Sequence, residues 1–253
     1  MNMTKTTIAA AIFALGAAGA HAQATVKPDG QWRYALGAAA SASSGNTESS
    51  SLNFSGDGVR ATTLDKISFY GRALQGKTDG ETTAEQLALG ARYDRNFGPR
   101  WYGFGQGDYL HDKPANLSTR LSVAGGAGYH LIMGETTTFD VFGGLGYTND
   151  DFVDPAVVGG SLRDSYGRAE LLLGEESTHK YSESTTFKQR LVIYPNLRDT
   201  GEYRAEFDAG VAVAMTKVMS LTVGLNYRYN SDPGEGLEKG DMLFLTGISV
   251  KID

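Results

Sequence analysis

Residues 203–215, YRAEFDAGVAVAM, and residues 219–230, MSLTVGLNYRYN, each alternate between two kinds of side chain. In the first stretch the odd positions are mostly aromatic or aliphatic, and the even positions are charged or small. Successive side chains of a β-strand point to opposite faces, so each stretch has one apolar and one polar face. Strands of soluble sheets usually run about five or six residues, whereas a tilted strand needs about 9–11 residues to cross a bilayer. Length and alternation therefore predict membrane-crossing strands whose apolar side chains face lipid.

The same alternation recurs along the chain and predicts an all-β fold, an antiparallel transmembrane β-barrel of about twelve strands. Ten and fourteen strands are the alternatives for the strand number, and a soluble sandwich is the alternative fold. The predicted strands lie near residues 31–43, 49–61, 65–76, 83–96, 100–111, 118–132, 136–148, 165–178, 184–195, 202–215, 218–230 and 241–252. The strand near 100–111 is ambiguous, because Gln106 and Asp108 share their parity with Tyr102 and Phe104.

Long and short connections tend to alternate between these strands. The stretches 148–164 and 230–240 are long and polar, whereas 96–99 and 133–135 are short. Barrels of the Gram-negative outer membrane have short periplasmic turns and longer extracellular loops, so this pattern predicts that location. We expect the aspartates of the longest loop, Asp150 among them, to be solvated rather than to bind calcium.

The first 22 residues have the features of a secretory signal peptide. Lys5 precedes an apolar stretch of about ten residues, and Ala20 and Ala22 frame an A-x-A cleavage site. The apolar stretch is too short for a helix that spans a membrane, which needs about 20 residues. The predicted organisation is a signal peptide over 1–22, a short periplasmic segment over 23–30 and an outer-membrane β-barrel over 31–253.

The composition of the chain excludes several kinds of site, partner and fold. The chain has no Cys, which excludes disulfides and thiolate metal sites. Its net charge of −6 argues against a nucleic-acid partner. A mean hydropathy of −0.27 excludes a helical membrane protein, but it averages over the two faces of a barrel strand. The 33 glycines, which show no three-residue period, suit strands that curve in a barrel.

The sequence shows no clear active site. Three of the four histidines follow the predicted leader, and only His111, near Asn116 and Ser118, resembles a nucleophilic cluster. That stretch contains a proline and is typical of a turn. His130 is predicted to face the lumen as a satisfied histidine. We therefore expect no catalytic, cofactor-binding or metal-ligating residue and no enzyme, with a lipid or lipopolysaccharide hydrolase as the third functional alternative.

Charges of both signs share the predicted inward face. On the lipid face an Arg or Lys would cost about 2–4 kcal/mol at mid-bilayer. The predicted lumen charge network consists of Arg92, Asp94, Arg120, Arg168, Glu170, Lys188, Arg190, Arg204, Glu206, Asp208 and Arg228. It is either a structural network that fills the lumen or a charge-lined path for small polar solutes or ions. Twelve strands lie between filled eight-stranded barrels and open sixteen-stranded porins, so size does not decide.

Several short motifs occur together in a fixed order: SGNT at 44–47, GKTDG at 76–80 running into TTAE at 82–85, RYD at 92–94, GGAGYHLI at 125–132 and YRYNSDP at 227–233. In this order and spacing the chain resembles the YdiY-like family, described as salt-induced outer membrane proteins and as a domain of unknown function, number 481. The resemblance covers about residues 31–252. It implies an outer-membrane β-barrel, without a reaction or a substrate.

These observations predict a non-enzymatic outer-membrane protein with a role in envelope structure or in adaptation to salt or osmotic stress. A narrow porin for small polar solutes or ions is the alternative. The expected partners are outer-membrane lipids and lipopolysaccharide, and the barrel-insertion machinery during biogenesis. The alternating final strand, 241–252, suits recognition by that machinery.

Overall fold

The computed structural model describes residues 26–43 and 49–252. The predicted signal peptide and the SGNT motif therefore lie outside the described residues. The described chain forms twelve strands: β1 (Trp32–Ser43), β2 (Ser49–Ala61), β3 (Asp65–Thr78), β4 (Glu81–Asn96), β5 (Trp101–Asp112), β6 (Leu117–Met133), β7 (Thr137–Val158), β8 (Ser161–Lys180), β9 (Thr185–Pro195), β10 (Tyr203–Ala214), β11 (Met219–Asn230) and β12 (Gly240–Ile252). No helix in this part of the chain is long and apolar enough to span a membrane.

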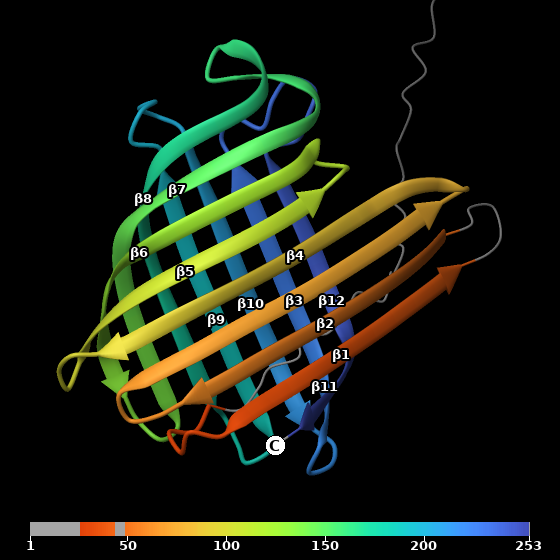
Figure 1. Ribbon diagram of the computed structural model, residues 1–253. Coiled ribbons are helices and arrows are strands. Elements are labelled where there is room, and N and C mark those ends of the chain that lie inside the picture. Colours follow the sequence, from red (N-terminus) through yellow and green to blue (C-terminus); the bar gives the residue numbers. More distant parts are fainter. Residues whose placement is uncertain (1–25, 44–48, 253) are drawn as a thin grey trace, which may run out of the picture.

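The twelve strands form one closed antiparallel barrel (Figure 1), which confirms the predicted fold class. Each strand pairs with its neighbours in sequence, and β12 returns to pair with β1. This closing seam is short, running from Tyr34↔Ile252 to Ala38↔Ile248, whereas β1 pairs with β2 along its whole length. We call the end where β1 starts and β12 ends the terminal end. The opposite end, with the connections 196–202 and 231–239, is the loop end.

The outer face of the barrel is apolar, as the alternation predicts. Leu121, Val123 and Leu145, for example, are each more than half exposed. Aromatic rings mark both ends of this surface: Trp32 packs beside Phe69 at the terminal end, and Tyr203 and Tyr229 stack at the loop end. Amphipathic rings at the two rims of an apolar band are typical of membrane-spanning barrels.

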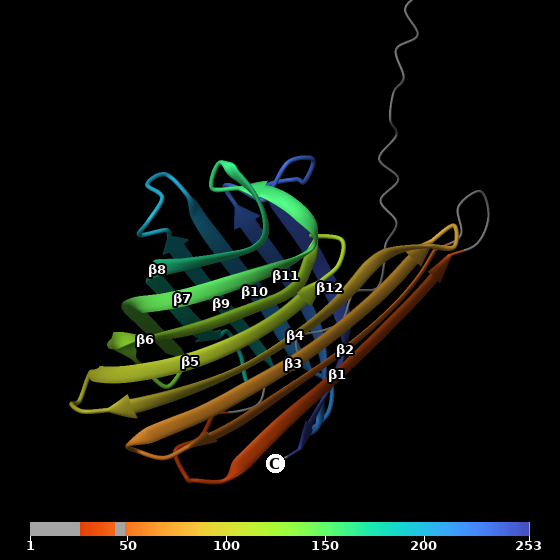
Figure 2. The same cartoon turned by 45° about the horizontal axis from the view of Figure 1, so that its top comes forward.

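The prediction of a long loop over 148–164 is wrong. β7 and β8 continue through it to a tight turn at Gly159 and Gly160, both with positive φ, and a bulge between Asp151 and Ala156 absorbs the proline. The hairpin curls over the loop end of the barrel (Figure 2). There the Gly159 N–H donates to Asp232 Oδ2 at 2.8 Å, so the hairpin tip is held by the β11–β12 connection.

The barrel interior contains an apolar cluster as well as charges. It consists of Tyr102, Phe104, Phe142, Leu172 and Val192, all buried. The ambiguous strand β5 thus turns Tyr102 and Phe104 inward, on the same face as Gln106 and Asp108. Glycines on neighbouring strands make the room, because a Cβ at Gly128 would collide with the Tyr102 ring and one at Gly174 with the Phe142 ring.

Candidate functional site

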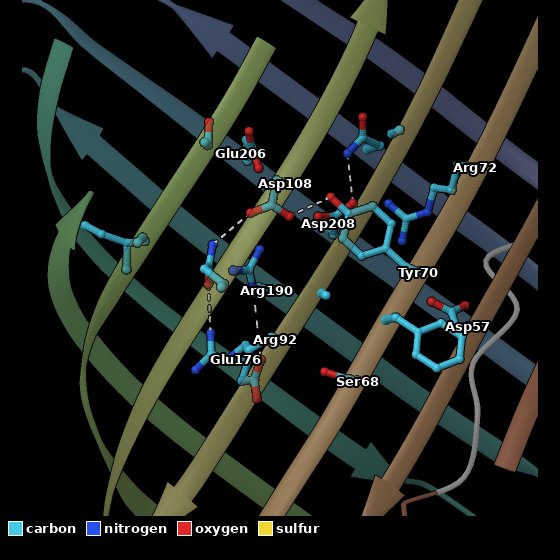
Figure 3. A pocket seen from close by; sticks show the side chains of 18 of the residues that line it. Asp57, Ser68, Tyr70, Arg72, Arg92, Asp108, Glu176, Arg190, Glu206 and Asp208 are labelled. Atoms are coloured by element: carbon cyan, nitrogen blue, oxygen red, sulfur yellow. Dashed lines mark hydrogen bonds and ion pairs between the residues drawn. The ribbon is translucent and has the colours of Figure 1, made fainter. Parts of the chain in front are cut away.

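The lumen contains a cavity of about 440 Å³ beside the apolar cluster (Figure 3). Its lining begins at Thr138 and Thr178, next to the terminal end, and reaches Leu110 and Arg120, next to the loop end. The cavity therefore extends along most of the length of the barrel. Every strand from β2 to β11 contributes lining residues, and many of these residues are charged.

A buried ionic network closes one side of the cavity; we call it the buried network. Glu170 is its centre and accepts hydrogen bonds from Arg168 Nε at 3.0 Å, Arg204 Nη2 at 2.8 Å and the Thr148 hydroxyl at 2.7 Å. Asp150 accepts from Arg168 Nη1 at 3.0 Å and joins Arg120 to the network. Glu170 and Asp150 are each only 2% exposed, so both carboxylates depend on these arginines for charge compensation.

A second group of charges lies toward the terminal end. Arg92 Nε donates to Asp94 Oδ1 at 2.8 Å, and its guanidinium lies 4.3 Å from the centre of the Phe104 ring. Lys66 Nζ lies 3.3 Å from Asp94 Oδ2 and 3.9 Å from Glu176 Oε1. Arg92 thus connects the apolar cluster with the charged cavity wall.

The middle of the cavity holds a row of polar side chains from β3 and β5, of which Tyr70, Arg72 and Asp108 are labelled in Figure 3. The Tyr70 hydroxyl donates to Asp108 Oδ1 at 2.9 Å, and Gln106 donates to Asp108 Oδ2 at 3.2 Å. The Arg72 guanidinium lies over the Tyr70 ring, 5.0 Å from its centre. Across from this row, Asp208 accepts a hydrogen bond from Asn226 at 2.8 Å.

The structure divides the eleven residues of the predicted lumen network among several groups. Arg120, Arg168, Glu170 and Arg204 meet in the buried network. The other predicted residues form the second group or line the cavity: Arg92, Asp94, Lys188, Arg190, Glu206, Asp208 and Arg228.

Sequence reasoning missed further charged residues of the lumen. Asp57, Lys66, Asp108 and Glu176 line the cavity as well. Inward parity was the available signal for all of them except Asp108, whose strand has an ambiguous alternation. The expectation that Asp150 is solvated is wrong, because it lies on an extended β7 and is buried between Arg120 and Arg168.

The histidines are engaged in local contacts. His111 Nδ1 lies 2.8 Å from the main-chain oxygen of Ser118. The histidine therefore contacts the backbone of Ser118 and not its hydroxyl. His130 lies 2.8 Å from Asp140 and stacks on Tyr102. Within the described ranges, no group of three or more His, Asp or Glu side chains is arranged to hold a metal ion.

A closed barrel with an apolar exterior, aromatic rims and a charged interior is a transmembrane β-barrel, because only closed barrels let strands satisfy all backbone groups in lipid. The protein is thus a barrel of the Gram-negative outer membrane. The family model described as "Protein of unknown function, DUF481" matches residues 36–252, so the chain belongs to this family, and the predicted family resemblance is confirmed.

The chain is also similar to one curated protein and to several solved structures. The chain is 26% identical over 194 residues to the uncharacterized protein YdiY of Escherichia coli strain K12, which covers 77% of this chain and 72% of the relative. Among solved structures, the NanC porin is similar with a TM-score of 0.45 and 13% identity over 87% of this chain and 96% of that chain. The translocator domain of the autotransporter NalP from Neisseria meningitidis is similar with a TM-score of 0.45 and 13% identity, over 87% of this chain and 86% of that chain.

Proposed function

We propose that this outer-membrane barrel is a non-enzymatic, narrow conduit for ions and small polar solutes. The observation that carries the proposal is the charged cavity, whose lining runs from residues beside the terminal end to residues beside the loop end. Within the part of the chain that the structure describes, Lys188 and Glu206 line this cavity without a hydrogen bond or ion pair to another side chain. Charges of this kind are available to a passing ion.

A filled barrel that serves envelope structure or salt adaptation is the second candidate function. The buried network favours it, because its two carboxylates are compensated by three arginines and the five side chains occupy lumen space. Under both candidates the apolar outer belt contacts outer-membrane lipids and lipopolysaccharide, and insertion machinery assembles the barrel.

The absence of enzymatic activity is part of the proposal. Nucleophilic catalysis needs a base within hydrogen-bond reach of the nucleophile. The best candidate, His111, is bonded to a main-chain oxygen instead, and its Nε2 lies 3.8 Å from Glu85. Lipid or lipopolysaccharide hydrolysis by the purified barrel that is lost in His111→Ala would contradict this part of the proposal.

Planar-bilayer recording of the refolded protein in KCl tests the conduit directly. We expect discrete conductance steps, with a size below that of open sixteen-stranded porins because the apolar cluster and the buried network narrow the lumen. A bilayer that stays silent at high load of correctly folded protein would support the filled barrel. Migration on gels before and after heating verifies folding in each preparation.

A further inference from the structure

Two ion pairs cross the lumen instead of joining neighbouring strands. Arg228 Nη1 on β11 lies 3.6 Å from Asp112 Oδ2 on β5, and these strands are six places apart in the ring of twelve. Lys66 Nζ on β3 lies 3.9 Å from Glu176 Oε1 on β8, five places apart. Both pairs therefore connect opposite walls of the barrel. We call them the transverse pairs.

The transverse pairs lie at different heights and enclose the middle of the cavity. Asp112 is the last residue of β5, and Arg228 is two residues from the end of β11, so their pair lies at the loop end. Lys66 is the second residue of β3, and Glu176 is four residues from the end of β8, so the other pair lies toward the terminal end. The row of Tyr70 and Asp108 lies between them.

Both pairs are accessible to water. The side chains of Arg228 and Asp112 are 25% and 15% exposed, and those of Lys66 and Glu176 are 32% and 33% exposed. In the buried network, Arg204 and Glu170 are 6% and 3% exposed and lie closer together, at 2.8 Å. Mobile ions in the cavity therefore reach these partly exposed pairs, and salt screens them more than it screens the enclosed buried network.

Each transverse charge also has a partner on its own wall. Lys66 lies beside Asp94 at 3.3 Å, and Arg190 lies 4.0 Å from Glu176. Asp112 accepts a hydrogen bond from Gln86 at 2.6 Å. Arg228 stands opposite Asp241 in the β11–β12 register. When the side chains of a transverse pair move apart, none of the four charges is left without a polar neighbour, so opening is inexpensive.

We infer that the transverse pairs are two salt-sensitive latches that narrow the conduit at both ends and release as ionic strength rises. The inference rests on the proposed conduit function and adds its regulation. The Debye length falls from about 10 Å at 0.1 M salt to about 3 Å at 1 M, which is shorter than the distance across either pair. High salt therefore screens much of the attraction within each pair.

Conductance across a KCl series is the first test. The matched variant carries Arg228→Gln with Asp112→Asn and Lys66→Gln with Glu176→Gln, which removes both attractions and leaves the net lumen charge unchanged. Between 0.1 and 1 M KCl we expect the ratio of conductance to bulk conductivity to rise about two- to fivefold in the natural protein, the range that weak, water-accessible ion pairs give. In the variant the ratio should not rise. A lumen with fixed charges and no latch concentrates counterions at low salt, so a falling ratio in both proteins would overturn the inference.

Cysteine labelling provides a readout that does not depend on conduction. The chain has no Cys, so Ser68→Cys, which lies in the cavity between the latches, is a unique thiol. We expect a small charged methanethiosulfonate to modify it about two- to fivefold faster at 1 M than at 0.1 M KCl, and at one rate in the matched variant. Salt-dependent labelling with a silent bilayer would support the latches and overturn the conduit. Equal labelling in both backgrounds at every salt would overturn the latches, even if the protein conducts.

A charge-swapped protein distinguishes a latch from a folding defect. Arg228→Asp with Asp112→Arg keeps a transverse pair of opposite charges at the loop end. With reagent added from outside, we expect Arg228→Gln with Asp112→Asn to abolish the salt dependence of Ser68→Cys modification. We expect the charge-swapped protein to restore this salt dependence. If the charge-swapped protein folds correctly and its labelling rate is as independent of salt as that of the neutral variant, the transverse attraction at this end is not the latch.

Discussion

The lumen holds two ionic regions that use the same residue types and differ in burial. In the buried network, Glu170 and Asp150 are enclosed and each carboxylate contacts more than one arginine. In the transverse pairs the charges are partly wet, lie 3.6 and 3.9 Å apart and have other partners nearby. Attraction in a dry site must offset a large desolvation cost, so its partners cannot separate cheaply. Water at the transverse pairs lowers the cost of separating their charges. The difference in burial therefore distinguishes the buried network, which is structural, from the transverse pairs, which can move.

The largest expected effect comes from breaking the buried network. Glu170→Ala leaves Arg168 and Arg204 facing each other in a dry site, so we expect a loss of about 3–5 kcal/mol in the free energy of unfolding. The matched change in the wet region, Glu176→Ala, should cost less than about 1 kcal/mol. Urea unfolding of each protein in lipid vesicles measures both values. Similar losses would show that the two regions do not differ as described.

A new arginine on one or the other face of β10 compares the cost of a charge in the lipid with its cost in the lumen. Val211→Arg places a charge on the outer face of β10, where we expect a cost of about 2–4 kcal/mol near mid-bilayer. Ala212→Arg points into the lumen, where water and carboxylates are available, and should cost less. The yield of folded barrel and its unfolding in vesicles report both. Equal tolerance would contradict the assignment of faces.

The packed side of the lumen also depends on a close approach of two strands. A Cβ on Gly126 of β6 would collide with the main chain of Gly143 and Gly144 on β7. We expect Gly126→Ala to destabilise the barrel by about 1–3 kcal/mol, because the strands must move apart. Gly105→Ala is the control, since nothing lies within 4 Å of its Cβ position. A neutral Gly126→Ala would mean that this side is less tightly packed than the geometry indicates.

The smallest expected effect concerns an ion pair at the start of β1, between Arg33 on the strand and Asp29 before it. Asp29 accepts two hydrogen bonds from Arg33, and these hold the pKa of Asp29 well below its usual range. A depressed pKa in the folded state stabilises the fold above the ordinary aspartate pKa, near 4, and the gain is lost as the pH falls further. The difference in urea midpoint between the natural protein and Asp29→Asn should therefore be present at pH 7 and shrink below pH 4. A difference that grows on acidification would refute this reasoning.

The alternation of side chains was enough to predict most of the fold. All twelve predicted strands are present, because a period of two residues directly sets which face meets lipid. The predictions failed where the local residue types indicate a different structure from the one that forms. Pro155 and four nearby aspartates indicate a loop over 148–164, yet a bulge admits the proline and Asp150 finds two arginines. Periodicity could not resolve β5, whose inward Tyr102 depends on the room left by Gly128 of β6.

The inward charges could also be found from parity, but their grouping could not. Arg228 and Asp112 are separated by about half of the barrel sequence, and no spacing rule connects them. They meet because β12 closes on β1 and the ring of twelve then places β11 opposite β5. The sequence by itself determined the face of each strand residue, since alternation is a property of a single strand. Only the tertiary structure decided which charges are buried and which face each other across water, since that depends on ring closure and on the volume that the aromatic cluster fills.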